Sequence, residues 1–120
     1  MDENVWAYRP VAAYQSGMDL TGFKVEASDG SIGKVDKHSE DVGAAYIVVD
    51  TGTWIFGKEV LLPAGVVVRV DPKEKKIYVD RTKDQIKSAP EFDKEKHLDN
   101  PDYHQQLGTY YAHPRPRPMM

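Results

Sequence analysis

The sequence predicts an all-β domain, a small six-stranded β-barrel with a short helix after the last strand and aromatic-bearing N- and C-terminal arms. Two observations favour this class. Residues 20–80 form a series of short alternating or β-branched segments at hairpin spacing, with turn-forming residues and no helical segments between them. The chain of 120 residues has room for one domain, and its 40% of hydrophobic residues is an ordinary globular composition.

The first two strands are predicted from alternation around a tight turn. Residues 23–27 alternate apolar and charged side chains, which is the period-2 pattern of a half-buried strand. Asp29 and Gly30 follow as a turn, in which glycine accepts the positive φ that a tight hairpin needs. A second strand is then expected over residues 32–37.

The other four strands are expected over residues 46–50, 54–62, 66–70 and 77–79. The first of these, YIVVD, is apolar on both faces and therefore predicts a central strand. Asp71 and Pro72 start the turn before the last strand, because proline pre-sets φ at the second turn position.

One helix is expected after the strands, and a second segment carries some features of a helix. Thr82 and Gln85 form a Thr-x-x-Gln capping box, and Pro90 ends the helix that they open. A second helix would start at Asn100 with proline at its first position, at a cost of about 1 kcal/mol for Gly108 relative to alanine. The sequence leaves open whether this second segment is helical. As a helix it places on one face Tyr103, Leu107, Tyr110 and Tyr111.

Composition excludes several classes of function. Sixteen Lys and Arg against nineteen Asp and Glu give a net charge of -3, so no basic surplus favours nucleic acid as a partner. The absence of cysteine excludes disulfides, thiol catalysis and Cys-based zinc sites. Apolar runs fall short of the roughly 20 residues of a membrane span, and no secretory signal pattern is visible. We therefore expect a cytoplasmic protein without a membrane span.

Candidate catalytic and metal-binding residues are few. Asp50 ends an apolar strand and His38 lies in a charged segment; for Asp50 a hydrogen-bonded turn is the favoured role, and for His38 an exposed turn. Whether either has a further role stays open. His97 and His104 with Asp99 and Asp102 lack a recognised metal-ligand spacing. The sequence thus predicts no enzyme, no cofactor and no metal site.

Several segments carry a resemblance to a known family. They are DGSIGKV at 29–35, YIVVD at 46–50 and GKEVLLP at 57–63, with VDRTKDQI at 79–86 and APEF at 89–92. The stretch that contains them resembles the PRC-barrel family, as found in the H subunit of photosynthetic reaction centres and in ribosome-maturation factors, and looks like the stand-alone bacterial members. The resemblance implies a small barrel with a binding role, because the family is not known as a class of enzymes. Without a preceding membrane helix or RNA-associated domain, neither photosynthesis nor ribosome assembly is carried over.

The domain organisation follows from this match. We expect an N-terminal arm over residues 1–18, the barrel over 19–93, and an extension over 94–120 that is Pro-rich and mobile at its end. Six of the twelve aromatic residues lie outside the barrel, where rings are expected to cover its surface or a partner. Inside the barrel, Trp54 and Phe56 alternate on one face of their strand. Such a pair of rings is compatible with the core, with a protein interface or with stacking of bases. The candidate interface residues are Trp6, Tyr8, Tyr14, Trp54, Phe56, Tyr103, Leu107, Tyr110 and Tyr111.

These observations predict a non-enzymatic binding or scaffolding module that acts through contacts with an unidentified protein partner and as a homodimer or higher homo-oligomer. The alternative is an RNA-binding accessory protein related to ribosome-maturation barrels. Convergence of Lys34, Lys37, Lys58 and Arg69 on one face would favour RNA. A deep pocket that holds Asp50 or His38 would favour an enzyme.

Overall fold

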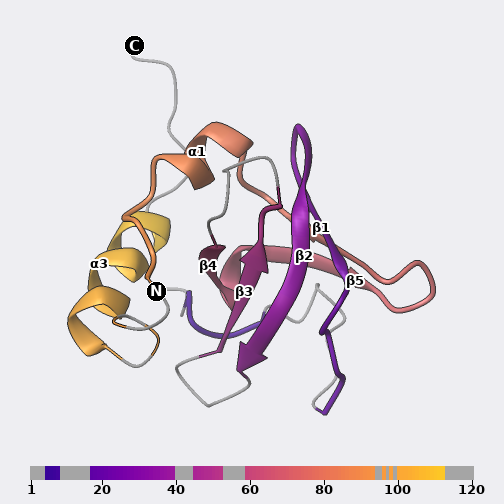
Figure 1. Cartoon of the computed structure of the whole chain (residues 1–120), viewed down its shortest axis with the longest axis horizontal. Coiled ribbons are helices and arrows are strands. Elements are labelled where there is room, and N and C mark those ends of the chain that lie inside the picture. The colour runs from indigo at the N-terminus through magenta and orange to yellow at the C-terminus, as the bar shows by residue number, and fades with distance from the viewer. Residues whose placement is uncertain are drawn as a thin grey trace.

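The computed structural model describes residues 5–8, 17–39, 45–52, 59–93, 96, 98 and 100–112. One six-stranded sheet has the strand order β4-β3-β2-β1-β6-β5 and carries two helices on its β4 side (Figure 1). The strands are β1 (Lys24–Ala27), β2 (Gly30–Ser39), β3 (Tyr46–Asp50), β4 (Glu59–Pro63), β5 (Val67–Asp71) and β6 (Lys76–Val79). A 3-10 turn, η2 (Ala64–Val66), and the helices α1 (Lys83–Lys87) and α3 (Pro101–Ala112) complete the described elements.

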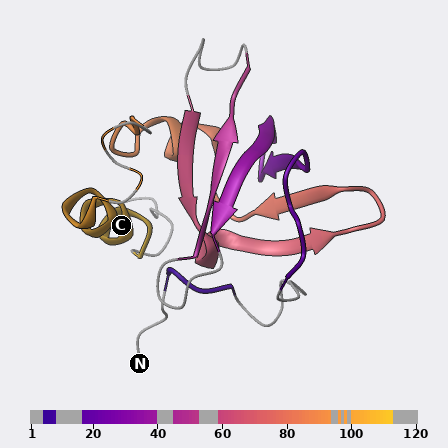
Figure 2. The same cartoon turned by 60° about the horizontal axis from the view of Figure 1, so that its bottom comes forward.

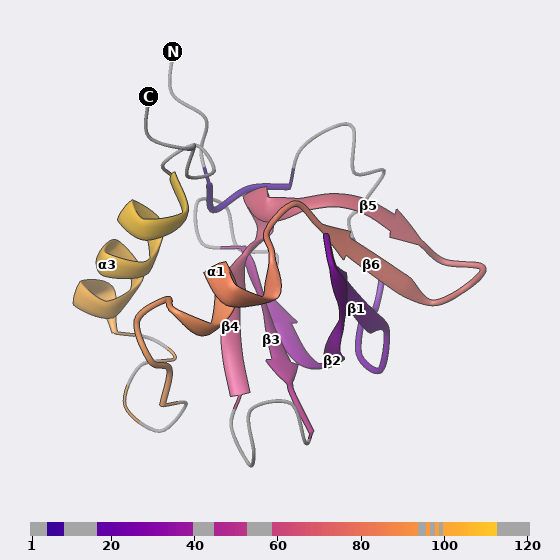
Figure 3. The same ribbon diagram turned by 90° about the horizontal axis from the view of Figure 1, so that it is seen from above.

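The number of strands and the mostly β fold confirm the prediction, and the sheet of the expected barrel is not closed. β4 and β5 are the two edges of the sheet, and no ladder joins them in the described part of the chain. The three-residue turn η2 connects these edge strands directly, and they leave it in different directions (Figure 3). Strands that diverge from a shared turn cannot form the last ladder of a barrel, so the sheet coils without closing.

The pairing of β1 with β6 is parallel, whereas hairpin spacing predicted antiparallel neighbours. Val25 of β1 lies opposite Ile77 of β6, and the first and last strands thereby become neighbours in the middle of the sheet. The other ladders are antiparallel. A local sequence pattern carries no information about such a distant partner, because both strands alternate in the same way whichever neighbour they take.

Strand β3 is buried on both faces, which confirms the predicted central position. Ile47 and Val49 face the interior of the coiled sheet, together with their in-register neighbours on β4. Tyr46 and Val48 point to the outer face, and Tyr46 meets His104 of α3 edge-on at 5.8 Å between ring centroids. The helix α3 therefore covers the outer face of β3 and β4, and Figure 2 shows it on the β4 side of the sheet.

The predicted helix is present, and the second segment, which the sequence left open, is also helical. The capping box at Thr82 and Gln85 opens α1, and the helix ends at Lys87 rather than continuing to Pro90. The helix α3 starts at Pro101, and three of its four predicted face residues are buried in the same core as the sheet. Its fourth face residue, Tyr110, is partly buried against that core.

Residues 5–8 lie between the sheet and α3. The carbonyl of Val5 accepts a hydrogen bond from the Gly65 N–H at 2.7 Å, and the carbonyl of Trp6 accepts one from Ala45 at 2.9 Å. The Trp6 indole stacks on His104 with 5.0 Å between centroids and 14° between planes. A Cβ at Gly108 would lie 2.6 Å from the indole Nε1, so the glycine in α3 makes room for this ring.

Replacement of Gly108 by alanine tests that packing. Alanine is the better helix former by about 1 kcal/mol, yet the clash with Trp6 should outweigh this gain and lower the free energy of unfolding by about 1–3 kcal/mol. Chemical denaturation measures the change. The control, Thr109→Ala, lies at an exposed position of the same helix and should be neutral or stabilising. A Gly108→Ala chain more stable than the wild type would contradict the contact.

Candidate functional site

A pocket of about 250 Å³ lies between β4, the segment that contains and follows α1, and the end of α3. It is smaller than the roughly 300–1,000 Å³ of typical cofactor and small-molecule sites and suits one large side chain. Its residues are mostly apolar, with a charged rim. The apolar ones are Val60, Leu61, Ile86, Ala89, Pro90 and Phe92, and the polar ones are Glu59, Lys87, Glu91 and Tyr111.

The α1 side of the pocket is fixed by reciprocal capping. The Thr82 Oγ1 accepts a hydrogen bond from the Gln85 N–H at 3.1 Å, and the Gln85 Oε1 accepts one from the Thr82 N–H at 2.8 Å. The Lys83 N–H donates to Asp29 Oδ1 at 2.8 Å, which ties the first turn of α1 to the turn between β1 and β2. Ile86 is then held in the pocket wall, with 1% of its surface exposed.

Two tyrosine hydroxyls tie α3 to this segment. The Tyr110 Oη donates to the Gln85 carbonyl at 2.7 Å, and the Tyr103 Oη donates to the Pro90 carbonyl at 3.0 Å. Burial raises the pKa of Tyr103 well above its ordinary value, and the nearby Glu91 carboxylate raises it further. Both phenols therefore reach across to backbone carbonyls at the ends of the pocket segment.

Arg81 anchors the C-terminal turn of α3. Its guanidinium is buried, donates through Nη2 to the Tyr111 carbonyl at 2.6 Å, and lies 5.8 Å from the Tyr111 ring centroid. Its Nη1 contacts the carboxylate of Asp80. The last carbonyls of a helix lack intrahelical partners and carry partial negative charge, so a cation is favourable there. Arg81 thus holds in place Tyr111, one of the residues that line the pocket.

Tyr111 has a buried phenol that lines the pocket. The residue is 1% exposed, and burial raises the pKa of its phenol far above the ordinary value, so the hydroxyl stays protonated. Among the described residues its hydroxyl has no hydrogen-bond partner. An unpaired buried hydroxyl costs about 1–3 kcal/mol. The pocket lining therefore includes a residue whose buried hydroxyl is unsatisfied.

Neither of the residues that would have indicated an enzyme, Asp50 and His38, lines this pocket. Asp50 is exposed, and its Oδ1 accepts a hydrogen bond from the Gly52 N–H at 2.9 Å, which confirms the predicted turn role. His38 lies in β2 and not in an exposed turn; its Nε2 accepts from the Leu20 N–H at 3.2 Å and lies 3.5 Å from Asp19. A hydrogen bond from the Thr21 N–H lowers the pKa of Asp19.

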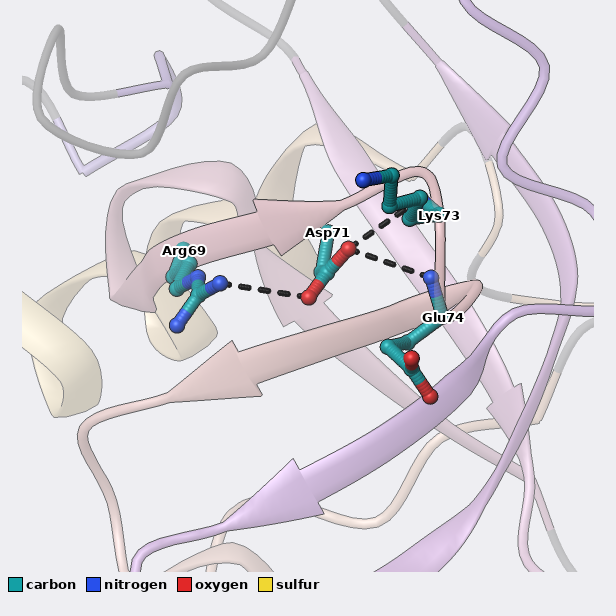
Figure 4. Close-up of polar contacts among 4 residues, drawn as sticks. All are labelled: Arg69, Asp71, Lys73 and Glu74. Atoms are coloured by element: carbon teal, nitrogen blue, oxygen red, sulfur yellow. Dashed lines mark hydrogen bonds and ion pairs between the residues drawn. The ribbon is translucent and has the colours of Figure 1, made fainter.

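Asp71 has the predicted structural role in the turn between β5 and β6 (Figure 4). Its Oδ1 accepts hydrogen bonds from the N–H groups of Lys73 and Glu74, both at 3.1 Å, and its Oδ2 lies 3.1 Å from the Arg69 guanidinium. Arg69 also lies over the Tyr78 ring, 5.6 Å from its centroid. The tip of this hairpin is therefore organised by one carboxylate.

The predicted interface residues differ in how deeply they are buried and in whether the structure describes them. Tyr103, Leu107 and Tyr111 are buried within this chain, where they hold α3 on the sheet. Half-buried positions belong to Trp6, Tyr8 and Tyr110. Tyr14, Trp54 and Phe56 lie outside the described residues. A contact of any of the nine with a second chain stays a prediction. No pattern in the sequence distinguishes the pocket residues Leu61, Ile86 and Phe92, or Arg81, which binds the end of α3.

The metal candidates are only partly described. The His104 Nε2 lies 2.7 Å from the Leu98 carbonyl, Asp102 is exposed, and the other two residues of the set, His97 and Asp99, lie outside the described part. The described residues contain no group of three or more His, Asp or Glu placed to hold a metal ion. Within the same residues no helix is long and apolar enough to cross a membrane.

Comparison with known proteins identifies the family. The PRC-barrel domain matches residues 16–86, more than half of the chain, and the chain therefore belongs to the PRC-barrel family. A similar solved structure is RimM of Pseudomonas aeruginosa, a protein assigned to 16S ribosomal RNA processing, with 26% sequence identity and a TM-score of 0.49. The match covers 63% of this chain and 50% of RimM, so this chain matches about half the length of that protein. No curated protein matches the sequence significantly.

Loss of the Arg81 contacts with Tyr111 and Asp80, which together we call the Arg81 clamp, should strongly lower the stability of the fold. Arg81→Met keeps the aliphatic stem but leaves the Tyr111 carbonyl without its donor and Asp80 without its cation, and should lower the free energy of unfolding by about 2–4 kcal/mol. Arg69→Met is the matched control, because Arg69 is exposed and pairs with Asp71 at the surface. Its effect should stay below about 1 kcal/mol. Equal losses for the two variants in urea denaturation would contradict the clamp.

Proposed function

We propose that this PRC-barrel chain is a non-enzymatic protein-binding module whose pocket beside β4 receives one apolar side chain of a partner protein. The observation that carries the proposal is a mostly apolar pocket lined by Tyr111, whose buried hydroxyl has no hydrogen-bond partner among the described residues. A backbone carbonyl of a bound segment would accept its hydrogen bond once the Tyr111 side chain turns this shielded hydroxyl toward the pocket. The unpaired Tyr111 hydroxyl destabilises the native chain and, within the described residues, makes no hydrogen bond that would stabilise the fold. This favours a role in binding.

The shape and chemistry of the pocket support a protein side chain as the occupant. Leu61, Ile86 and Phe92 form a desolvated apolar wall, and charged residues stand only at the rim. Binding hot spots in protein interfaces have this arrangement, in which one buried anchor fills a pocket surrounded by a polar border. A nucleotide or dinucleotide would need more room than about 250 Å³ and a phosphate site.

A second candidate function, RNA binding, is favoured by one observation. Three lysines, Lys34, Lys24 and Lys76, lie in register across neighbouring strands. Of the other expected cations, Lys37 is exposed on the same face as Lys34, Arg69 is paired with Asp71, and Lys58 lies outside the described residues. The net charge of -3 disfavours a polyanion as long as RNA. The protein-binding function is therefore the better supported.

Removal of single hydroxyls tests the proposal. Tyr111→Phe should leave the free energy of unfolding unchanged or raise it by up to about 1 kcal/mol, because it removes an unpaired buried hydroxyl. The same change should weaken binding of the probe N-acetyl-phenylalanine methylamide about fivefold, since one hydrogen bond to its amide carbonyl is lost. Methyl NMR shifts at Leu61 and Ile86 report the binding.

The matched control is Tyr110→Phe on the next residue. It removes a hydroxyl that bonds the Gln85 carbonyl, and should destabilise the fold by about 1 kcal/mol. A Tyr111→Phe chain destabilised as much as this control would show that the Tyr111 hydroxyl is structural. Probe binding that is unaffected by Tyr111→Phe, or that shifts other methyl groups, would overturn the proposed pocket function.

Self-association is part of the proposed scaffolding role. It rests on the six aromatic residues in the N-terminal arm, 1–18, and the extension, 94–120. Light scattering at micromolar concentration is expected to give the mass of a dimer or larger. A constant monomer mass across the micromolar range would remove self-association from the proposal and leave the pocket function untouched, because the pocket is built from one chain.

A further inference from the structure

A row of charged side chains runs across the outer face of the sheet, in register from strand to strand. It begins with Glu59 of β4 at the pocket and continues through Asp50, Lys34 and Lys24 to Lys76 of β6. Directly opposed residues of paired strands share one face of the sheet. Lys24 and Lys34 are exposed and Lys76 is half-buried, so this side is solvent-facing beyond the pocket.

The three lysines, which we call the lysine row, lie opposite one another, and the outer two also lie opposite a carboxylate residue, Lys34 opposite Asp50 and Lys76 opposite Asp71. Like charges directly opposite one another destabilise a sheet. In the ion pairs formed by the described residues, none of the three ammonium groups takes part. Adjacent strands lie about 4.8 Å apart, so three positive charges start from backbone positions within about 10 Å of one another. Such a concentration of charge favours an anionic partner.

Acidic residues close both ends of the lysine row. Asp50 and Glu59 lie on one side, and Asp71 of β5 lies opposite Lys76 on the other. A long nucleic-acid strand laid along the row would bring its phosphates against these carboxylates, at an electrostatic cost. A short segment with two or three negative charges fits between them. The charge pattern therefore favours the carboxylates of a protein segment.

We propose that the lysine row binds an acidic stretch of the same partner segment whose apolar side chain enters the pocket beside β4. The inference rests on the proposed function of the pocket and specifies the partner's chemistry. From β4 the row begins two strand spacings away, about 10 Å, and ends four away, about 19 Å. An extended segment spans about 3.3 Å per residue. The acidic residues therefore lie about three to six positions from the anchor.

Two fluorescently labelled peptides test the inference on the full-length chain. Both carry one phenylalanine, an uncharged two-residue spacer and then either three glutamates or three glutamines. In fluorescence anisotropy the glutamate peptide should bind about tenfold more tightly at about 50 mM salt, and this advantage should vanish at about 500 mM, where exposed charges are screened.

Matched lysine variants locate the effect. The triple variant Lys24→Gln, Lys34→Gln and Lys76→Gln should bind both peptides equally and should melt no lower than the wild type, because repulsion is removed. The control triple variant, Lys73→Gln, Lys75→Gln and Lys96→Gln, changes the net charge equally at exposed positions outside the row and should keep the tenfold preference.

The outcomes separate this inference from the proposed function. Equal binding of the two peptides to the wild type, with the glutamine peptide still bound, overturns the lysine row and leaves the pocket function standing. Equal loss in both triple variants shows a net-charge effect and also overturns it. Binding of neither peptide overturns both proposals. Tighter, lysine-dependent binding of a short oligouridylate would replace the acidic partner with RNA.

Discussion

The docking of α3 on the outer face of β3 and β4 is the constraint on which the rest of the structure depends. One buried guanidinium, Arg81, supports it by binding the Tyr111 carbonyl at the end of the helix, and the Tyr110 and Tyr103 hydroxyls add two contacts to the pocket segment. Because α3 covers this face, β3 can be apolar on both sides, and the pocket gains its third wall. Without the helix, Leu61 on the edge strand β4 and Tyr46 on its neighbour β3 would be exposed, which is unfavourable in water.

Local patterns in the sequence were sufficient for the elements but not for their assembly. Alternation gave the strands to within a few residues, the Thr82–Gln85 capping box gave α1, and the spacing of Tyr103, Leu107 and Tyr111 gave the buried face of α3. The parallel pairing of β1 with β6, the open edge at β5 and the covered outer face are tertiary choices that such patterns do not encode. Arg81 illustrates the limit, since nothing around it distinguishes a buried cation from an exposed one. Likewise Gly108, which counts against a helix by propensity, is explained only by the Trp6 ring against it.

The outer face of the sheet has two halves with complementary roles in the proposed binding mode. Its covered half forms the apolar pocket, where burial of one anchor supplies affinity. Its uncovered half carries the lysine row, where charge supplies orientation and selectivity more than affinity. Glu59 belongs to both, as a rim residue of the pocket and the first member of the charged row. The proposed site for an acidic segment is local, and the net charge of -3 of the whole chain does not indicate it.

Native-state hydrogen exchange tests the central claim, that α3 and the sheet form one cooperative unit, most directly. Amides in α3 around Leu107 and Tyr111 should be protected to nearly the same opening free energy as those of Ile47 and Val49 in β3, since the helix opens only when the core opens. Exchange in α3 close to the rate of an unfolded chain, with β3 still protected, would contradict the account. The helix would then be a separable cover, and the pocket would exist only part of the time.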